Sequence, residues 1–381
     1  MKCNICGSNN IKELGIVGNQ PVSITSEPKL CSLSTKIYCC QKCFHMQKIY
    51  LPTENLFIDS MYNQYDAYKV SRGGEQLIFS EDGNPKTRSY FAIEKCIDLL
   101  PESGELLDIG TGNGTALKSA SQLLKKWKLF GFDIHEKFKK DVLKIPGVVD
   151  FYAGDFQDIP QKKFDLIILW HSLEHIAEPI KFLCQLRDYL TQEGLLLIQV
   201  PNVETMPFDL AVLDHCSHFT KLGLLKLCES IGLVQIIDGD NWVHNCITLL
   251  LKRTKSPQSI ESYAESKSLN PECYFYWLQK TIEEFEYATK GRSYGIFGTG
   301  ISGIWISSQL STPPAFFIDE DSERIGSKIS NVPIIRPQDV PAGVDIVMPF
   351  THATGKNITL KMQKLYDSCN SCNFILSQPY F

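Results

Sequence analysis

The sequence LLDIGTGNGT at residues 106–115 is the most informative part of this chain of 381 residues. An apolar strand pattern runs through Asp108 into a turn with Gly110, Gly112 and Gly114, and a helix pattern follows. Glycines at such a turn let the backbone bend tightly and approach a ligand closely, beside the free amide groups of a helix N-terminus. Dinucleotide-binding enzymes use Gly-x-Gly-x-x-Gly here to seat a pyrophosphate. The spacing Gly-x-Gly-x-Gly, with an acid two residues ahead, instead suits a ligand with an ammonium group.

Short apolar strands alternate with amphipathic helices on the C-terminal side of this motif. Strands are predicted at residues 106–110, 129–134, 149–155, 164–170 and 194–200. This alternation predicts a parallel sheet with helices on both faces. A helix at 221–232 and two antiparallel strands at 233–240 and 246–253 are expected to complete the sheet.

Acids also end the next two predicted strands. Asp133 follows the first glycine of the turn by about twenty residues, where a carboxylate reaches ribose hydroxyls. Asp155 and Phe156 follow the third strand and are expected to flank an adenine, by a hydrogen bond and by stacking. Together with the acid of the first strand, they predict S-adenosylmethionine as the cofactor of a class I methyltransferase fold. The alternative is a doubly wound sheet that binds another ligand at the same strand ends.

Two Cys-x-x-Cys pairs near the start of the sequence predict a zinc site. Cys3 and Cys6 form the first pair, and Cys40 and Cys43 form the second. Four thiolates at this spacing suit a closed tetrahedral site, which leaves no position open for substrate and therefore has a structural role. Cys39 competes as a ligand, but Cys40 gives the two-residue spacing to Cys43. Buried free cysteines are the alternative.

A second α/β segment is predicted from residue 293 onward. Its first strand runs into the glycines of YGIFGTGISG, which have Gly-x-Gly-x-x-Gly spacing: Gly298, Gly300 and Gly303. Asp319 ends the next predicted strand, as in an NAD-binding unit. No second set of catalytic residues accompanies the motif, so redox use of NAD is the less favoured alternative.

The chain is therefore predicted to be an α/β protein in which a class I methyltransferase sheet lies between two smaller units. A polar stretch at residues 252–272 predicts a linker, and a helix pattern at 273–290 follows it. The predicted parts are a zinc-binding module, a methyltransferase domain, a linker with a helix, and a Rossmann-like domain, at residues 1–70, 71–255, 256–290 and 291–381.

Composition and charge exclude some classes of binding partner. The net charge is -5 and the calculated pI is about 5.9, which argue against a broad electrostatic grip on nucleic acid or an anionic membrane. The first residues have no apolar segment of a secretory signal, and no apolar run is long enough to span a membrane. These features predict a cytoplasmic protein that acts on a small molecule, and they leave its oligomeric state open.

Motifs outside the cofactor segment carry a resemblance to a known family. The sequence WHSLEHIAEP follows the fourth strand at residues 170–179, and VPN follows the fifth at 200–202. The end of the cysteine-rich module, YCCQKCFHMQ at 38–47, is followed by tyrosines, and DHCSHFT stands at 214–220. With the two cysteine pairs, these segments resemble the deoxysugar C-methyltransferases. The resemblance covers nearly the whole chain and implies a zinc domain, a methyltransferase domain and a C-terminal Rossmann-like domain.

The resemblance also implies a reaction and its residues. Enzymes of this family methylate the carbon beside a ketone in a nucleotide-linked sugar, which requires a base for the alpha proton. Glu174 and His175 match the family's Glu-His pair, with His175 as the expected base, and His215 matches a second histidine that binds substrate or serves as the alternate base. Ser172 and His218 depart from the family pattern, which has aromatic hydroxyls there. Methylation of oxygen or nitrogen therefore remains an alternative, as does a packed histidine without a catalytic role.

Overall fold

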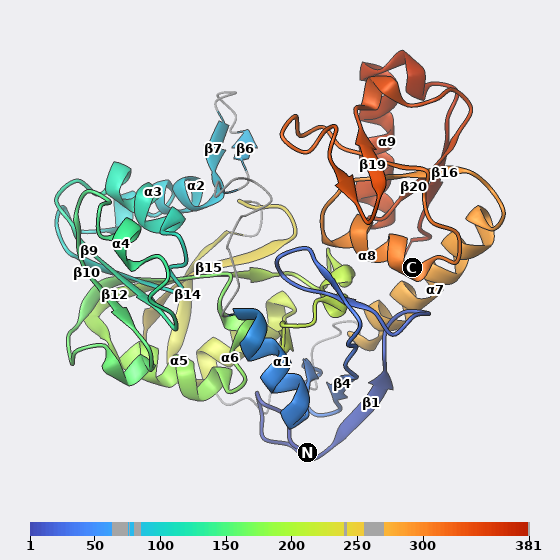
Figure 1. Cartoon of the computed structure of the whole chain (residues 1–381). Coiled ribbons are helices and arrows are strands. Elements are labelled where there is room, and N and C mark those ends of the chain that lie inside the picture. Colours follow the sequence, from blue (N-terminus) through green and yellow to red (C-terminus); the bar gives the residue numbers. More distant parts are fainter. Residues whose placement is uncertain (63–74, 76, 80–84, 240–241, 255–269, 380–381) are drawn as a thin grey trace.

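The computed structural model describes residues 1–62, 75, 77–79, 85–239, 242–254 and 270–379, which form three main sheets (Figure 1). Residues 255–269, most of the predicted linker, lie outside the described residues. None of the described helices has the length and apolar character needed to cross a membrane.

The central sheet has seven strands in the order β10-β9-β8-β11-β12-β15-β14. Its strands are β8 (Glu105–Ile109), β9 (Lys128–Asp133), β10 (Val148–Ala153), β11 (Phe164–Trp170), β12 (Leu190–Pro201), β14 (Leu233–Asp238) and β15 (Cys246–Arg253). The first five are parallel, and β15 is antiparallel to both of its neighbours. The prediction of a parallel sheet that ends in two antiparallel strands is confirmed.

Five helices accompany this sheet: α2 (Arg88–Glu94), α3 (Thr115–Leu123), α4 (Lys139–Val142), α5 (Pro179–Asp188) and α6 (Lys221–Ser230). Helix α5 begins with a proline, whose missing amide proton costs nothing at a first helical position, and it buries Leu183 and Leu186. The sequence RSYFAIEKCIDLL at residues 88–100 predicts one continuous helix, but the helix that forms there is shorter. Helix α2 ends at Glu94, and a separate 3-10 helix, η2 (Ile97–Leu99), precedes a proline that prevents further helix.

The cysteine-rich segment forms a four-stranded sheet in the order β1-β4-β5-β13. Its strands are β1 (Ile11–Gly15), β4 (Ile37–Cys40), β5 (Met46–Lys48) and β13 (Ser217–His218). A small hairpin of β2 (Ser23–Ile24) and β3 (Leu30–Cys31) lies beside it, and α1 (Pro52–Tyr62) follows. The outer strand β13 comes from the middle of the chain, where Ser217 pairs with Gln47 and His218 with Met46. The N-terminal sheet is therefore completed by a distant segment.

The C-terminal part has a six-stranded sheet in the order β18-β19-β17-β16-β20-β21 (Figure 1). Its strands are β16 (Tyr294–Phe297), β17 (Phe316–Ile318), β18 (Lys328–Ile329), β19 (Val332–Ile335), β20 (Asp345–Met348) and β21 (Asn373–Leu376). All pairs are parallel except β18 with β19. Its helices are α8 (Ile301–Gln309) and α9 (His352–Leu365), and α7 (Glu272–Thr289) precedes it.

Strand β4 packs its two faces into different hydrophobic cores. Cys40 belongs to the core on one face of the central sheet. Ile37 and Cys39 belong to a second core, which they share with α7 and β16. Successive side chains of a strand point to opposite faces, so adjacent cysteines are separated into two environments.

Candidate functional site

The glycine turn between β8 and α3 has the backbone conformation that its sequence predicts. Gly110, Gly112 and Gly114 have φ values of 72°, 50° and 80°, a region that side chains with a Cβ rarely adopt. A Cβ on Gly110 would collide with the hydroxyl of Ser172, which follows the neighbouring strand β11. The turn therefore needs glycine, and it lies directly beside the segment that holds the predicted catalytic residues.

Asp108 lies beneath this turn with its carboxylate buried. The residue is 1% exposed, and neither carboxylate oxygen has a hydrogen-bond partner among the described residues. Burial raises the pKa of the Asp108 carboxyl to about 7. A buried carboxylate without a partner is costly. A ligand with a positively charged group would remove that cost, so the residue fits the ammonium of S-adenosylmethionine.

We expect Asp108→Asn to stabilise the ligand-free protein at neutral pH. The folded-state pKa of this acid lies above its ordinary value, so the folded state loses stability as pH rises from about 4 to about 7. The uncharged amide removes this loss, and the stabilisation should grow by about 2 kcal/mol between pH 5 and pH 7. Urea unfolding at both pH values measures it, and a gain independent of pH would contradict the burial of an ionisable group.

The other two acids end adjacent strands at the same edge of the sheet. Asp133 accepts hydrogen bonds from the backbone N–H groups of Gly112 at 2.8 Å and His135 at 3.2 Å, so its carboxylate is fixed beside the glycine turn. Asp155 is exposed and comes just before the 3-10 helix η3 (Phe156–Asp158). The partly buried ring of Phe156 packs among aromatic rings of Phe132, Phe182 and Tyr189, at centroid distances between 5.0 and 5.8 Å.

The predicted base, His175, ends the 3-10 helix η4 (Leu173–His175), which follows β11. Its Nδ1 lies 2.9 Å from the backbone oxygen of Asp214 and 2.8 Å from the hydroxyl of Tyr62. Because the carbonyl can only accept, we assign the proton to Nδ1, and Nε2 then carries the lone pair. Its ring is 4.7 Å from that of His215, centroid to centroid. The structure thus brings together both histidines named from the sequence.

Asp209, in the 3-10 helix η5 (Pro207–Ala211), holds two buried histidines at once. Its carboxylate oxygens lie 2.6 Å from Nδ1 of His215 and 2.5 Å from Nδ1 of His218. Burial by itself would raise the pKa of Asp209, but the two histidines outweigh it and the pKa is lowered. Burial opposes the charged form of His215 as well, yet Asp209 raises the pKa of that histidine. His215 is therefore better suited to donate a proton than to take one.

Glu174 is 1% exposed and faces the same two histidines. One carboxylate oxygen lies 3.3 Å from Nδ1 of His171, and the other has no hydrogen-bond partner among the described residues. His171 has a φ of 50°, which is uncommon for a residue with a side chain. Burial alone would lower the pKa of His171, but Cys246 and Glu174 raise it to about 9. The contact with Glu174 therefore favours the charged form of this histidine.

Three residues of this site were not predicted from the sequence. His171 lies in the segment WHSLEH at residues 170–175. Its position directly after a buried strand could have indicated a site residue. Tyr62 ends α1, and the tyrosines after the cysteine-rich segment pointed only to its neighbourhood. Asp209 belongs to a short 3-10 helix without periodicity, so no local pattern indicated its contact with His215.

The four cysteine sulfurs of the two predicted pairs form one cluster. The Sγ atoms of Cys3 and Cys43 are 3.5 Å apart, as are those of Cys6 and Cys40, and all four lie within 4.8 Å of one another. Hydrogen bonds from Cys3 and Cys43 lower the pKa of Cys40, whereas contacts with Cys3 and Cys40 raise the pKa of Cys43. One thiolate thus suppresses the next, and only a cation would let all four ionise. Cys39 faces the other core, and burial raises its pKa to about 12.

The acid of the C-terminal glycine motif already has partners. The carboxylate of Asp319 accepts a hydrogen bond from the backbone N–H of Thr299 at 3.1 Å, and Arg324 lies 3.6 Å away. Arg324 also donates to the Thr299 hydroxyl at 2.9 Å. A ribose hydroxyl would have to compete with this arginine, which weakens the case for an NAD site.

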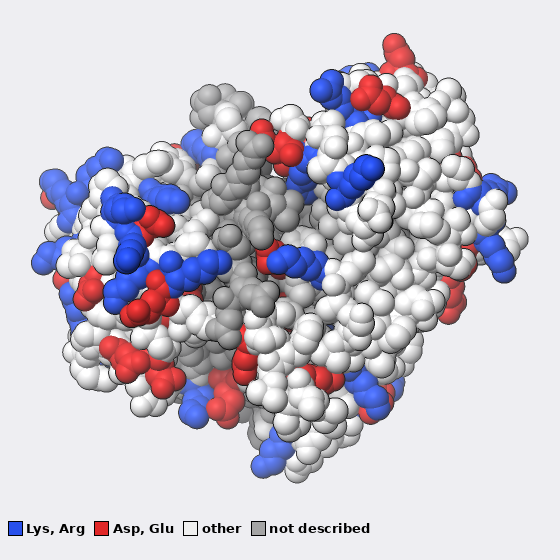
Figure 2. All heavy atoms as spheres, in the orientation of Figure 1, with Lys and Arg blue, Asp and Glu red and all other residues white. Residues whose placement is uncertain are grey.

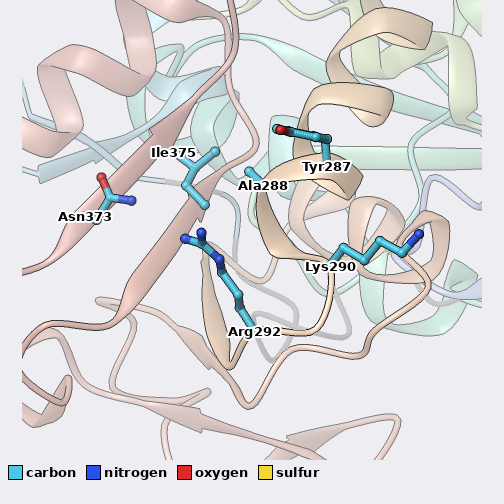
Figure 3. A pocket seen from close by; sticks show the side chains of 6 residues that line it. All are labelled: Tyr287, Ala288, Lys290, Arg292, Asn373 and Ile375. Atoms are coloured by element: carbon cyan, nitrogen blue, oxygen red, sulfur yellow. The ribbon is translucent and has the colours of Figure 1, made fainter.

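A shallow hollow of about 420 Å³ lies at the end of α7, away from the histidine cluster (Figure 3). It is lined by Tyr287, Ala288, Lys290, Arg292, Asn373 and Ile375. Figure 3 shows that the guanidinium of Arg292 points toward Asn373 and Ile375, and it lies 3.3 Å from the carboxylate of Asp345. The lining has no acid, histidine or thiol, so we place no chemistry there.

In the view of Figure 2, acidic and basic side chains are interspersed over the methyltransferase-type half, and much of the C-terminal half is uncharged.

Comparison with known proteins identifies part of the chain. Residues 86–236 match the family model described as a methyltransferase domain. No curated protein matches the chain significantly. The solved structures that resemble it include the mitomycin 7-O-methyltransferase MmcR, which is 14% identical with a TM-score of 0.39, over 44% of this chain and 53% of that protein. The chain thus spans about half the length of that relative.

Two further structures are similar. An S-adenosylmethionine-dependent methyltransferase from Clostridium acetobutylicum is 14% identical over 53% of this chain and 98% of its own, with a TM-score of 0.37. Human N-acetylserotonin methyltransferase, solved with S-adenosylmethionine, is 18% identical over 44% of this chain and 52% of its own, with a TM-score of 0.38. TM-scores below 0.5 give no information about the substrate of this chain.

Proposed function

We propose, from the premise that residues 86–236 form an S-adenosylmethionine-dependent methyltransferase domain, that this chain methylates the carbon beside a ketone in a nucleotide-linked sugar. The observation that carries the proposal is the position of His175. Its Nδ1 is held by the backbone oxygen of Asp214, and its η4 helix begins right after Ser172, which lies against the glycine turn. Carbon methylation needs a fixed base beside the cofactor site, because the alpha proton must be removed. An acceptor that ionises freely in water does not need such a base.

The cofactor would be held by the residues around the glycine turn. Asp108 offers a buried carboxylate to the ammonium group, Asp133 offers a fixed carboxylate to the ribose, and Asp155 and Phe156 lie at the next strand end for the adenine. Gly110, Gly112 and Gly114 allow the backbone conformation of the turn, which lets the main chain approach the ligand closely. When bound, S-adenosylmethionine supplies an electrophilic methyl group.

The remaining chemistry belongs to the histidine cluster. Nε2 of His175 takes the alpha proton of the sugar, and the enolate that results is the carbon nucleophile. His215 favours its protonated form through Asp209, so it donates a hydrogen bond to the oxygen on which negative charge develops. The unpartnered oxygen of Glu174 accepts a hydrogen bond from a sugar hydroxyl.

We further propose that Cys3, Cys6, Cys40 and Cys43 hold a structural zinc ion. Four sulfurs within 4.8 Å of one another fit a tetrahedral site with four thiolate ligands, and such a site leaves no open position. The zinc would anchor the N-terminal segment to the core that it shares with the methyltransferase-type sheet.

The function is tested by incubating the protein with S-adenosylmethionine and a panel of nucleotide-linked ketosugars. We expect a mass increase of one methyl group and a proton NMR signal of a methyl group on carbon. The signal of a methyl group on oxygen or nitrogen would show that the acceptor atom is not carbon and would favour the alternative reaction. Turnover of NAD with the same sugars, without methyl transfer, would reject the proposal.

We expect Asp133→Ala to weaken the binding of S-adenosylhomocysteine by roughly 1.5–3 kcal/mol, the cost of losing hydrogen bonds to a charged group. Isothermal titration calorimetry measures the change. Asp141→Ala is a matched control, because Asp141 is an exposed acid that pairs with Lys144 and has no proposed part in cofactor binding. Unchanged affinity in Asp133→Ala would place the ribose elsewhere.

A further inference from the structure

We propose that Glu174, His175 and His215 form a second metal site, which binds a borderline divalent cation such as Zn²⁺ or Co²⁺ and thereby switches off the base. The metal site stands on the geometry alone, whereas the loss of activity rests on the proposed role of His175.

The three side chains offer ligand atoms at a common point. One atom from each lies within 4.8 Å of the other two. Ligands at about 2.0–2.2 Å from one ion are at most about 4.4 Å apart, so small side-chain rotations bring all three onto a cation. The cluster lies apart from the four cysteines, which form their own group.

Both histidines are oriented as metal ligands usually are. Metal-binding histidines almost always give their other ring N–H to a carbonyl or carboxylate, which fixes the ring and its tautomer. Nδ1 of His175 lies 2.9 Å from the backbone oxygen of Asp214, and Nδ1 of His215 lies 2.6 Å from the carboxylate of Asp209. Nε2 of each ring makes no hydrogen bond within the described part of the chain. A cation that binds there displaces the proton that Asp209 favours on His215.

Glu174 gives an independent indication of a bound cation. Its side chain is 1% exposed, and one of its carboxylate oxygens is buried without a partner among the described residues. His171 lies 3.3 Å from the other oxygen and holds the carboxylate in place. An unpaired buried carboxylate oxygen is unfavourable, and a cation between it and two imidazoles would satisfy it.

The ligand set selects the class of metal. Imidazole suits zinc, copper, cobalt and nickel, whereas magnesium and calcium prefer oxygen ligands alone. Two histidines and one carboxylate leave a coordination position open, unlike the cysteine site. A cation on Nε2 of His175 takes the lone pair that the base needs for the alpha proton, so the metal-bound and the proton-accepting states exclude each other.

The test uses the full-length protein with one equivalent of zinc already on its cysteine site. Co²⁺ is then added and its visible absorption recorded. We expect one further equivalent to bind with the weak bands of a nitrogen and oxygen site and without the strong near-ultraviolet bands of a cobalt–thiolate bond. Glu174→Gln and His215→Gln should each weaken this binding at least tenfold. Glu178→Gln is the matched control, since this exposed glutamate pairs with Lys181 and lies outside the cluster.

Near-ultraviolet circular dichroism and retained zinc show whether each variant folds. If one variant does not fold, the other still tests the metal site. Absence of the second equivalent in the unaltered protein would overturn the metal site. So would an affinity in both variants equal to that of the unaltered protein. In the activity arm, methyl transfer should fall in proportion to cobalt occupancy. A rate that rises with occupancy would overturn the exclusion of the base. If no nucleotide-linked sugar is methylated at all, the proposed function fails, while the absorption titration still decides the metal site.

Discussion

The variant His175→Asn should lose both alpha-proton exchange and methyl transfer, each by roughly two to four orders of magnitude, the usual contribution of a positioned base. Asparagine retains an N–H for the backbone oxygen of Asp214 but has no nitrogen that takes a proton. The acceptor carbon of the sugar should exchange its alpha hydrogen with solvent deuterium when S-adenosylhomocysteine replaces the methyl donor. Proton NMR follows this exchange without any methyl transfer.

Two controls keep this result specific. His352→Asn changes a histidine of the C-terminal part whose Nδ1 lies 2.7 Å from the backbone oxygen of Ser377, so it should leave exchange and methylation unchanged. S-adenosylhomocysteine should bind His175→Asn with unchanged affinity, because the glycine turn and its acids lie on other loops. Methylation at the normal rate would show that His175 is not the base, and His215 would be the next residue to test.

Replacing Cys40 by serine should remove zinc from the protein and unfold its N-terminal sheet. Structural zinc sites supply on the order of 10 kcal/mol of apparent binding free energy, and loss of one thiolate from a closed site forfeits much of it. Cys39→Ser should retain zinc, because the side chain of Cys39 faces the core shared with α7. It should cost about 1–3 kcal/mol, the price of a buried hydroxyl in apolar surroundings.

Elemental analysis gives the zinc content of both variants, and thermal unfolding compares their stability. The unaltered protein should hold one zinc in the cysteine cluster. Equal loss of zinc in the two variants would mean that Cys39 is also a ligand, and folded protein without any zinc would reject the site.

The sequence was most informative where one segment carries the whole signal. Each of the strands β8 to β12 is a continuous, largely apolar segment, and the glycines at 110–114 predict a tight turn. The central sheet was therefore predictable. The antiparallel pair β14 and β15 was predictable as well, because a turn separates two apolar segments. The helix pattern at 88–100 was misleading, since a 3.6-residue period does not show where a helix tightens into a 3-10 turn before a proline.

The candidate site was less predictable because it depends on contacts between distant segments. Asp209 meets His215 and His218 through a short helix that has no periodic pattern. Tyr62 reaches His175 from the N-terminal part of the chain. Strand β13 has only two residues, too few for a strand pattern, yet it completes the N-terminal sheet. Such pairings follow from tertiary packing, which a single sequence does not display.

A ribosome releases the last cysteine of the N-terminal module roughly 10–35 seconds before it releases Ser217, at ordinary rates of synthesis. During that interval β5 has no strand β13 to pair with, so an N-terminal sheet that forms then would have an open edge at β5. Open edges invite pairing with other chains, and proteins commonly limit this hazard by keeping such strands short. Strand β5 spans only Met46–Lys48 and ends in a lysine. The unpaired edge of β5 thus exposes few backbone N–H and C=O groups with which a neighbouring nascent chain could pair.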